Sequence, residues 1–429
     1  MTPEQPTDNG HLLIFDGELI SSGSHCLEYD RLLARTARRH GIATTVLSHI
    51  NFAETEQLEC EGVRVETVVT KSHWLDDFRE YGGRGWFFEL LGRFLHGLAN
   101  ARDLWPSLKR CRYDCVFLPS VFPADVIALA LLRPLGAFRR AGRVVFLMRW
   151  DILDHAVPNP VPARKLVYLR LLFKFLGREI RRGRLVLLTD SRQLMLDYRR
   201  VCGVDSLPLS CPRTVPYRER PQPGADQPIT FSVIGLSRYE KGVDLLLDAI
   251  GQILASGEVP NAQFIVQLDR PLTLPDGTVY ECPPEVLQSD RVHLIRHAPP
   301  PEEYEELLQR TDCMVLAYRR EFYHSRTSAI AIEASCMDMP IIYTRDCWLE
   351  DYVGEFGAGL GVPSDDLAAL RQAIVAMAAD WEKHSGAAAR QGSKARARND
   401  AEEFLRVLWG KPLPPPVESP VPHGHERSA

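Results

Sequence analysis

Short apolar runs alternate with segments of helical periodicity along most of the chain. Runs of this length are typical of strands buried on both faces, and the helical segments between them can connect parallel neighbours. In the first half of the chain we predict strands at residues 11–15, 43–48, 64–69, 115–118, 144–148 and 185–188. This pattern predicts an α/β fold built on a parallel sheet.

The alternation is interrupted at residues 211–228, where prolines are frequent and apolar residues are few. It then resumes, with strands predicted at 230–234, 263–268, 291–295, 313–317 and 341–343. Two arrays of similar size favour two Rossmann-like domains that face each other across a cleft.

The predicted organisation follows from these two arrays. Residues 1–10 are expected to be a disordered N-terminus, 11–210 an N-terminal Rossmann-like domain and 211–228 a linker. Residues 229–395 are expected to form a C-terminal Rossmann-like domain, and 396–411 a helix that returns to the N-terminal domain. The Pro-rich, polar tail at 412–429 has no means of building a core, so we expect it to be disordered.

Composition and charge narrow the function classes. The 429 residues carry a net charge of -5, which argues against a nucleic-acid partner. None of the ten cysteines is paired at CxxC spacing, so no zinc site is expected. The first ten residues are polar and acidic, and no apolar run is long enough to span a bilayer. These features favour a cytoplasmic protein with reduced cysteines and no bound metal or cofactor.

The stretch Phe231–Ile250 carries the most chemical information. A predicted strand ends at Gly235, the following loop holds Arg238 and Lys241, and Gly242 precedes an amphipathic helix. At this end of a parallel strand, free N–H groups and the helix dipole favour anions. A guanidinium fork beside a mobile ammonium suits a diphosphate. A solvated turn that happens to hold two basic residues fits the same short pattern.

This stretch resembles the donor-phosphate loop of family 4 glycosyltransferases, which have the GT-B architecture. In that family a strand leads into a glycine, Lys-Gly follows six residues later, and a Leu-rich helix begins. Most members have an arginine directly after the first glycine, where this chain has Leu236. A subgroup has it three residues after the glycine, as Arg238 stands here. The resemblance implies that Arg238 and Lys241 hold the diphosphate of a nucleotide sugar and stabilise it as it leaves.

A second block supports the first. Residues 311–318 resemble the family's strand before the donor-sugar loop, and residues 325–344 resemble its Glu-x7-Glu region. Glu333, seven residues before Pro340, stands at the second glutamate and is expected to accept hydrogen bonds from ribose hydroxyls. The first glutamate falls at Ser325 and is absent, and Glu321 cannot be assumed to replace it. Considered alone, Glu333 also fits a surface or ion-paired carboxylate.

The resemblance implies a wider set of donor-binding residues. Gly23 lies in the Gly- and Ser-rich loop after the first predicted strand, although an ordinary turn has the same composition. Glu350 matches another family glutamate, with a surface acid as the alternative. Asp338 stands where the family has a glycine. The complete expected donor-binding set is Gly23, Gly235, Ser325, Thr327, Ser328, Glu333 and Glu350.

One segment of the N-terminal half carries a candidate catalytic side chain. Residues 149–155 follow a predicted strand and resemble the subgroup's His-Asn-x-x-Pro-His segment. His155 matches the second histidine, whereas Trp150 replaces the first. The resemblance implies that His155 orients the donor sugar or helps to move a proton. A loop histidine with structural hydrogen bonds is the alternative.

Residues 164–184 contain eight lysines or arginines and a single acid, Glu179. A basic amphipathic helix of this kind can lie on an anionic membrane near a lipid-linked acceptor, giving peripheral contact at the inner face. A helix packed on the N-terminal sheet with a solvated basic face is the alternative. The aromatic stretch at 86–95 is interpreted as core or acceptor-side packing.

The resemblance covers residues 11–409 and implies an enzyme. Its donor is a nucleoside-diphosphate sugar, bound by the C-terminal domain, and its acceptor is an unidentified hydroxyl compound on the N-terminal side. Transfer is expected to retain the anomeric configuration and to serve surface polysaccharide or glycolipid assembly. No Asp-x-Asp triplet is present to bridge a metal to phosphate. Two alternatives stay open: a GT-B nucleotide-sugar epimerase, and a non-catalytic sugar-nucleotide-binding homologue.

Overall fold

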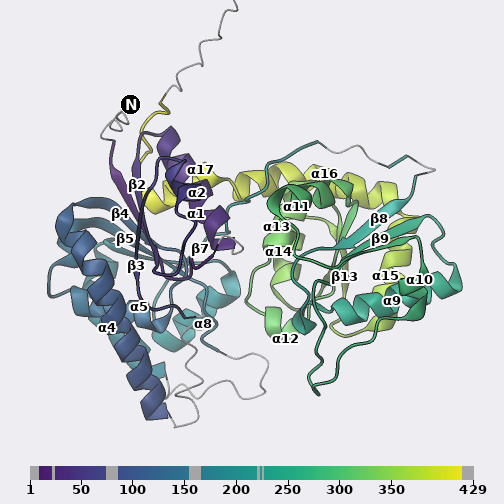
Figure 1. Cartoon of the computed structure of the whole chain (residues 1–429), viewed down its shortest axis with the longest axis horizontal. Helices are drawn as coiled ribbons and strands as arrows, with labels where there is room; N and C mark the ends of the chain where they lie inside the picture. The colour runs from purple at the N-terminus through teal and green to yellow at the C-terminus, as the bar shows by residue number, and fades with distance from the viewer. Residues whose placement is uncertain are drawn as a thin grey trace, which may run out of the picture.

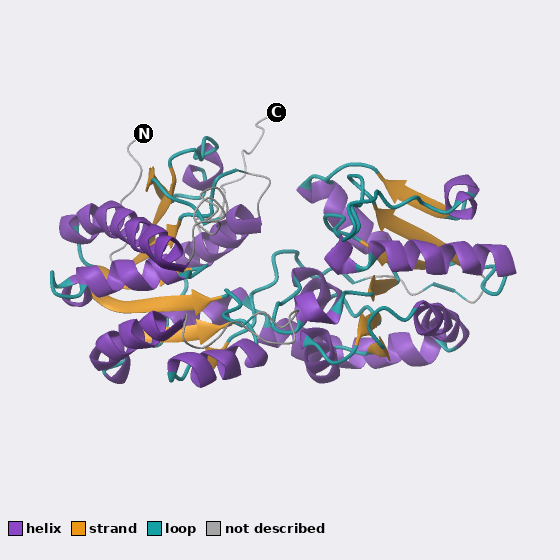
Figure 2. Cartoon of the chain, turned by 90° about the horizontal axis from the view of Figure 1, so that it is seen from below, coloured by secondary structure: helices purple, strands orange, loops and turns teal. Residues whose placement is uncertain are grey.

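The computed structural model describes residues 9–21, 25–73, 86–153, 166–219, 223–224 and 227–417. Its described strands form two parallel sheets, one in each half of the chain, and helices cover both faces of each (Figures 1 and 2). None of the described helices is long and apolar enough to cross a membrane.

The N-terminal unit is a seven-stranded sheet in the order β3-β2-β1-β4-β5-β6-β7. Its strands are β1 (His11–Asp16), β2 (Ala43–His49), β3 (Arg64–Val69), β4 (Tyr113–Leu118), β5 (Ala141–Met148), β6 (Leu185–Thr189) and β7 (Leu207–Pro208). Its helices are α1 (His25–Arg39), α2 (Glu56–Glu59), α4 (Trp86–Arg110), α5 (Pro123–Leu132), α6 (Ala137–Arg140), α7 (Val167–Arg181) and α8 (Arg192–Cys202).

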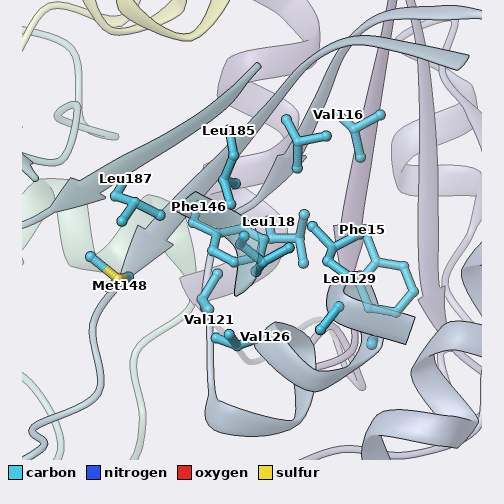
Figure 3. Packing of buried hydrophobic residues seen from close by; sticks show 14 of the residues in the cluster. Phe15, Val116, Leu118, Val121, Val126, Leu129, Phe146, Met148, Leu185 and Leu187 are labelled. Atoms are coloured by element: carbon cyan, nitrogen blue, oxygen red, sulfur yellow. The ribbon is translucent and has the colours of Figure 1, made fainter. Parts of the chain in front are cut away.

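Burial on both faces of this sheet explains the continuous apolar runs in the sequence. Along β5, Phe146 and Met148 belong to the buried cluster that includes α5 (Figure 3), whereas Val145 and Leu147 belong to the cluster on the opposite face. Successive side chains of a strand point to opposite faces, so both sets must be apolar when helices cover both faces.

The C-terminal unit is a six-stranded parallel sheet in the order β10-β9-β8-β11-β12-β13. Its strands are β8 (Ile229–Val233), β9 (Ala262–Gln267), β10 (Val292–Ile295), β11 (Cys313–Leu316), β12 (Ile341–Thr344) and β13 (Gly359–Val362). Its helices are α9 (Val243–Ser256), α10 (Pro284–Gln288), α11 (Pro301–Arg310), α12 (Arg320–Tyr323), α13 (Ala329–Cys336), α14 (Trp348–Phe356), α15 (Leu367–Ala379) and α16 (Trp381–Arg398).

The last helix, α17 (Ala401–Trp409), packs on the N-terminal unit. Phe404 and Trp409 are buried in the same cluster as residues of α1 and β4, and the Phe404 ring lies 5.8 Å from that of Tyr29. The segment that follows, residues 412–417, falls in the predicted disordered tail. In the structure it lies beside the end of α1, where the N–H of Val417 donates to the carbonyl of Arg39.

Gly242 joins the first strand of the C-terminal sheet to α9 in a turn that has no room for a side chain. Its φ is 62°, in the left-handed region. A Cβ at this position would lie 2.0 Å from the carbonyl oxygen of Ala317, which follows β11. Glycine is therefore required here both for the backbone conformation and for the close approach of two chain segments.

Gly242→Ala is expected to lower the melting temperature more than Gly257→Ala. Both glycines adopt a left-handed conformation, which costs an alanine about 1–2 kcal/mol. Only Gly242 has a neighbouring atom that a Cβ would strike, since nothing lies within 4 Å of the corresponding position on Gly257. Thermal unfolding of the two variants measures the difference, and equal losses would contradict the importance of the Ala317 contact.

Candidate functional site

The loop from Gly235 to Gly242, here called the phosphate loop, lies at the carboxyl end of β8. In the sheet order β8 is flanked by β9 on one side and by β11 on the other. The chain thus reverses the direction in which it adds strands at this point. In open α/β sheets such a switch point leaves a crevice at the carboxyl ends of the strands, where ligands bind.

Residues at the end of β9 and just after it fix the first half of the phosphate loop. The N–H of Gly235 donates to Oε1 of Gln267 at 2.6 Å, and the N–H of Ser237 donates to Oδ1 of Asp269 at 2.8 Å. The hydroxyl of Ser237 also donates to the carbonyl of Gln267 at 3.0 Å. The backbone of this half of the loop is therefore held by one neighbouring strand.

Arg319, which follows β11, fixes the second half of the loop. Its guanidinium donates to both carboxylate oxygens of Asp244 in the first turn of α9, at 3.0 and 2.7 Å, and pairs with Asp365 at 2.8 Å. The guanidinium also lies 3.5 Å from the centre of the Tyr239 ring, and the backbone N–H of Arg319 donates to the backbone carbonyl of Glu240. Removing one partner of a buried, hydrogen-bonded pair costs about 3–5 kcal/mol, so this residue is a major support of the loop.

Arg319 is absent from the residues predicted from the sequence. It directly follows the predicted strand 313–317 and Tyr318, at the carboxyl end of the strand that neighbours β8. This position, at the carboxyl end of a predicted strand, is the sequence feature that could have identified Arg319. Its partner Asp244 lies 75 residues earlier in the chain, and only the folded sheet shows that the two meet.

Three cations gather at the end of the phosphate loop. Nζ of Lys241 and Cδ1 of Ile330 lie 2.8 and 2.6 Å from the place that a Cβ on Gly235 would occupy. Glu240 contacts both Arg238 and Arg326 at 3.3 Å. Arg238 and Arg326 therefore share one carboxylate, and Lys241 lies beside Gly235 and the first turn of α13.

The electrostatics of this cluster favour an anion. Burial, reinforced by the charge of Arg238, lowers the pKa of Lys241 to about 8. Lys241 forms no ion pair within the described part of the chain, and the Arg238 side chain is 49% exposed. The acids near the three cations are Glu240 and Asp269, and Asp269 is itself paired with Arg270, so an excess of positive charge remains that a diphosphate can neutralise. Arg326 is also absent from the predicted residues, although it adjoins Ser325 in a segment expected to bind the donor.

The segment between α12 and α13 of the C-terminal unit meets the N-terminal unit at two carboxylates. The hydroxyl of Thr327 donates to Oδ2 of Asp190 at 3.0 Å, and the hydroxyl of Ser325 donates to Asp151. Asp151 and Asp190 follow β5 and β6, so the carboxyl ends of both sheets face this interface (Figure 2). Burial raises the pKa of Asp190 to about 6, against the opposing effects of Arg149 and Thr327.

Glu333 lies on the interior side of α13. Its side chain is 4% exposed, and its carboxylate accepts hydrogen bonds from the hydroxyl of Tyr304 at 2.5 Å and from that of Thr214 at 2.9 Å. Burial raises the pKa of this carboxyl above its usual range. A ribose would have to share these oxygens with, or displace, two protein hydroxyls. Ribose binding by Glu333 stays a prediction.

Other sequence candidates are less central or lie outside the described residues. Glu350 is partly exposed and accepts from the N–H of Asp346 at 2.8 Å, and Ser328 caps α13 through the N–H of Ala331. Gly23 and His155 lie outside the described residues. Within the described residues, no group of three His, Cys, Asp or Glu side chains is arranged to hold a metal ion.

The structure accounts for the aspartate that stands where the resembled family has a glycine. Asp338 has φ of 61°, a conformation that aspartate tolerates better than most residues. Its carboxylate accepts hydrogen bonds from Arg396 at 2.8 Å and from the hydroxyl of Tyr217 at 3.0 Å. The turn after α13 is therefore preserved, and the aspartate attaches it to α16 and to the linker.

Comparisons with known proteins match this arrangement. Residues 228–380 match the family model described as Glycosyl transferases group 1. A comparison with curated proteins gives no match. Sucrose-phosphate synthase from Thermosynechococcus elongatus is a similar solved structure, with 14% identity and a TM-score of 0.63 over 94% of this chain and 98% of that one.

Two further solved structures have the same architecture. Alr3699/HepE from Anabaena, in complex with UDP and glucose, is 14% identical with a TM-score of 0.58, over 94% of this chain and 99% of that one. A glycosyltransferase from Rickettsia africae is 13% identical with a TM-score of 0.59, over 94% and 98% of the two chains. At these identities the likeness shows the fold, and it confirms the predicted GT-B arrangement of two Rossmann-like domains.

Binding of a nucleoside diphosphate to the phosphate loop is expected to weaken as the pH rises through about 8. Lys241 loses its proton in that range because its pKa is lowered, whereas the second phosphate ionisation, near about 6, is already complete. Affinity should be greatest near about pH 7, between the phosphate ionisation and that of Lys241, and should fall at higher pH by at most about tenfold per pH unit, as one proton is lost.

Isothermal titration calorimetry across this range measures the effect. Lys241→Arg is the matched control, because a guanidinium keeps its charge throughout. The same pH dependence in both proteins would show that a group other than Lys241 is responsible.

Proposed function

We propose, from the premise that residues 228–380 form a glycosyltransferase domain of group 1, that the whole chain is a retaining glycosyltransferase. It would transfer a sugar from a nucleoside diphosphate to a hydroxyl acceptor. The observation that carries this proposal is the phosphate loop at the switch point of the C-terminal sheet, which presents Arg238 and Lys241 and whose Glu240 contacts Arg326.

The chemistry requires these cations at the moment of bond cleavage. As the bond between the sugar and the diphosphate breaks, negative charge grows on the departing phosphate oxygens. Arg238 can offer paired donors and Lys241 a mobile charge at the base of the loop. Each preorganised donor of this kind contributes about 2.7–4 kcal/mol to the transition state in other enzymes. The supports from β9 and β11 keep the loop in place, so little reorganisation is needed when the charge develops.

A uridine nucleotide is the first donor to test. The similar Anabaena structure was solved in complex with UDP and glucose, and in another case with UDP-glucose. The ribose of such a donor would approach Glu333, where Tyr304 and Thr214 now occupy the carboxylate. Assembly of a surface polysaccharide or glycolipid remains our proposed setting for the reaction.

The missing first glutamate of the Glu-x7-Glu pattern has a candidate replacement in the other domain. Ser325 stands at that position and is 1% exposed, and its hydroxyl donates to the carboxylate of Asp151. A carboxylate therefore reaches the expected donor-sugar position from the loop after β5 instead of from the loop before α13. We propose that Asp151 accepts hydrogen bonds from the hydroxyls of the donor sugar.

Arg238→Ala and Lys241→Ala are each expected to abolish measurable transfer and to weaken binding of UDP. The loss in kcat should be on the order of a hundredfold or more, because each cation acts chiefly on the leaving diphosphate. Product formation from UDP-glucose, GDP- and ADP-sugars with candidate acceptors measures transfer, and NMR of the product anomer tests retention. Arg390→Ala, at an exposed position on α16, is the control and should keep full activity.

The same assay separates the alternatives. An epimer formed without any acceptor would favour the epimerase, and tight UDP-sugar binding with no turnover would favour a non-catalytic homologue. Full activity in Lys241→Ala with a verified donor would remove the phosphate loop from the mechanism.

Asp151→Asn is expected to raise KM for the nucleotide sugar by about tenfold to a hundredfold, the usual loss for a hydrogen bond to a charged group. The dissociation constant of the free nucleoside diphosphate should stay unchanged, since no sugar is present to contact the carboxylate. Steady-state kinetics and calorimetry measure the two quantities on one protein. If KM for the nucleotide sugar and the dissociation constant of the nucleoside diphosphate rise equally, Asp151 holds the domains together and does not recognise the sugar.

A further inference from the structure

An apolar groove of 740 Å³ lies between α4 and α7 on the N-terminal unit, with α5 at its floor. Its walls are large apolar side chains that include Phe87, Leu91 and Phe94 of α4, and Leu171 and Phe175 of α7. Figure 1 shows α4 extending along the outer side of this unit, away from the C-terminal unit. The groove is thus separate from the interface that holds the phosphate loop.

The side chains around this groove are unusually exposed for their size. Phe87 is 63% exposed, Leu171 60% and Leu95 51%, and Trp86 is 45% exposed at the beginning of α4. The interpretation of residues 86–95 as core packing is therefore wrong, whereas acceptor-side packing stays a prediction. These positions alternate on α4 with buried small residues such as Gly97, which let the helix approach α5 closely, so the bulky side chains are left on the outer face.

Exposed cations accompany the apolar side chains on α7. Val167, Leu171 and Phe175 recur every four residues and form one exposed row. A parallel row of exposed basic residues consists of Arg170, Lys174, Arg178, Arg181 and Arg182. The one acid of this helix, Glu179, is buried and paired with Arg184 and Arg133. The outer face of α7 therefore presents positive charge with no exposed acid to balance it.

We propose that the outer faces of α4 and α7 bind the surface of a bilayer that contains anionic lipids. The exposed apolar row and the aromatic side chains of α4 would enter the boundary between headgroups and acyl chains. The basic row would lie level with the headgroups, where long cationic side chains extend their charge into the polar layer. The apolar groove between the helices has the volume and lining to take part of an acyl chain.

The charge pattern favours a lipid surface over another protein. A protein partner would have to supply acids that match five cations along one helix while covering the adjacent apolar row. An anionic leaflet offers both features over any area and in any register. The inference is independent of the proposed activity, because binding to lipid requires no nucleotide sugar.

Vesicle flotation of the full chain tests this proposal. We expect the protein to float with vesicles of phosphatidylcholine and phosphatidylglycerol, and to bind vesicles of phosphatidylcholine alone much less. Arg170→Gln/Lys174→Gln/Arg178→Gln should weaken binding by about a hundredfold, at about fivefold for each cation. Phe87→Ser/Leu171→Ser should also abolish flotation, and salt should weaken binding by the wild-type protein.

Matched variants test whether vesicle binding depends on the outer faces of α4 and α7. Leu287 and Val279, which are 55% and 57% exposed on the C-terminal unit, serve as the apolar control when both are changed to serine. Arg390→Gln serves as a charge control, and thermal unfolding checks that each variant is folded. Flotation that is unaffected by the α4 and α7 variants would overturn the proposal. So would a concentration-dependent dimer that Phe87→Ser/Leu171→Ser abolishes without any vesicle binding, since the occupant would then be a second copy of the chain.

Discussion

The candidate site depends on the contact between the phosphate loop and the two strands that flank β8. Gln267 and Asp269 hold the loop from one side, and Arg319 holds it from the other through Asp244 and the ring of Tyr239. Gly242 allows the turn to press against the carbonyl of Ala317. Because these supports come from different strands, the sheet sets the position of the phosphate loop. The residues of the loop alone would not hold it in this position.

Because these contacts hold the loop, the cluster of Arg238, Lys241 and Arg326 can keep an excess of positive charge. Arg319 is neutralised twice, by Asp244 and Asp365, whereas Arg238 and Arg326 share a single acid and Lys241 has no ion pair within the described residues. Arg319 and the three cations of the candidate site thus differ in how completely they are paired. A lowered pKa for Lys241 is the expected result of keeping an ammonium partly buried beside other cations.

Much of the fold could be predicted from the sequence because both sheets are parallel and covered on both faces. Buried strands such as β11 and residues 144–148 of β5 then appear as continuous apolar runs with clear ends. The strand β13 was missed because glycine occupies two of its four positions, and β7 because it has only two residues. The phosphate loop was found because its residues are contiguous. Arg319, Arg326 and Asp151 were not, since their roles depend on partners that only the folded chain brings near.

The chain passes between the two units twice, once through the linker and once between α16 and α17. On its return it contributes Phe404, Leu405, Leu408 and Trp409 to the interior of the unit in which the polypeptide began. The N-terminal unit is therefore incomplete until synthesis has reached the far end of the chain. A ribosome-bound nascent chain that has just released its first two hundred residues must keep one wall of this hydrophobic core open to solvent until the last helix emerges.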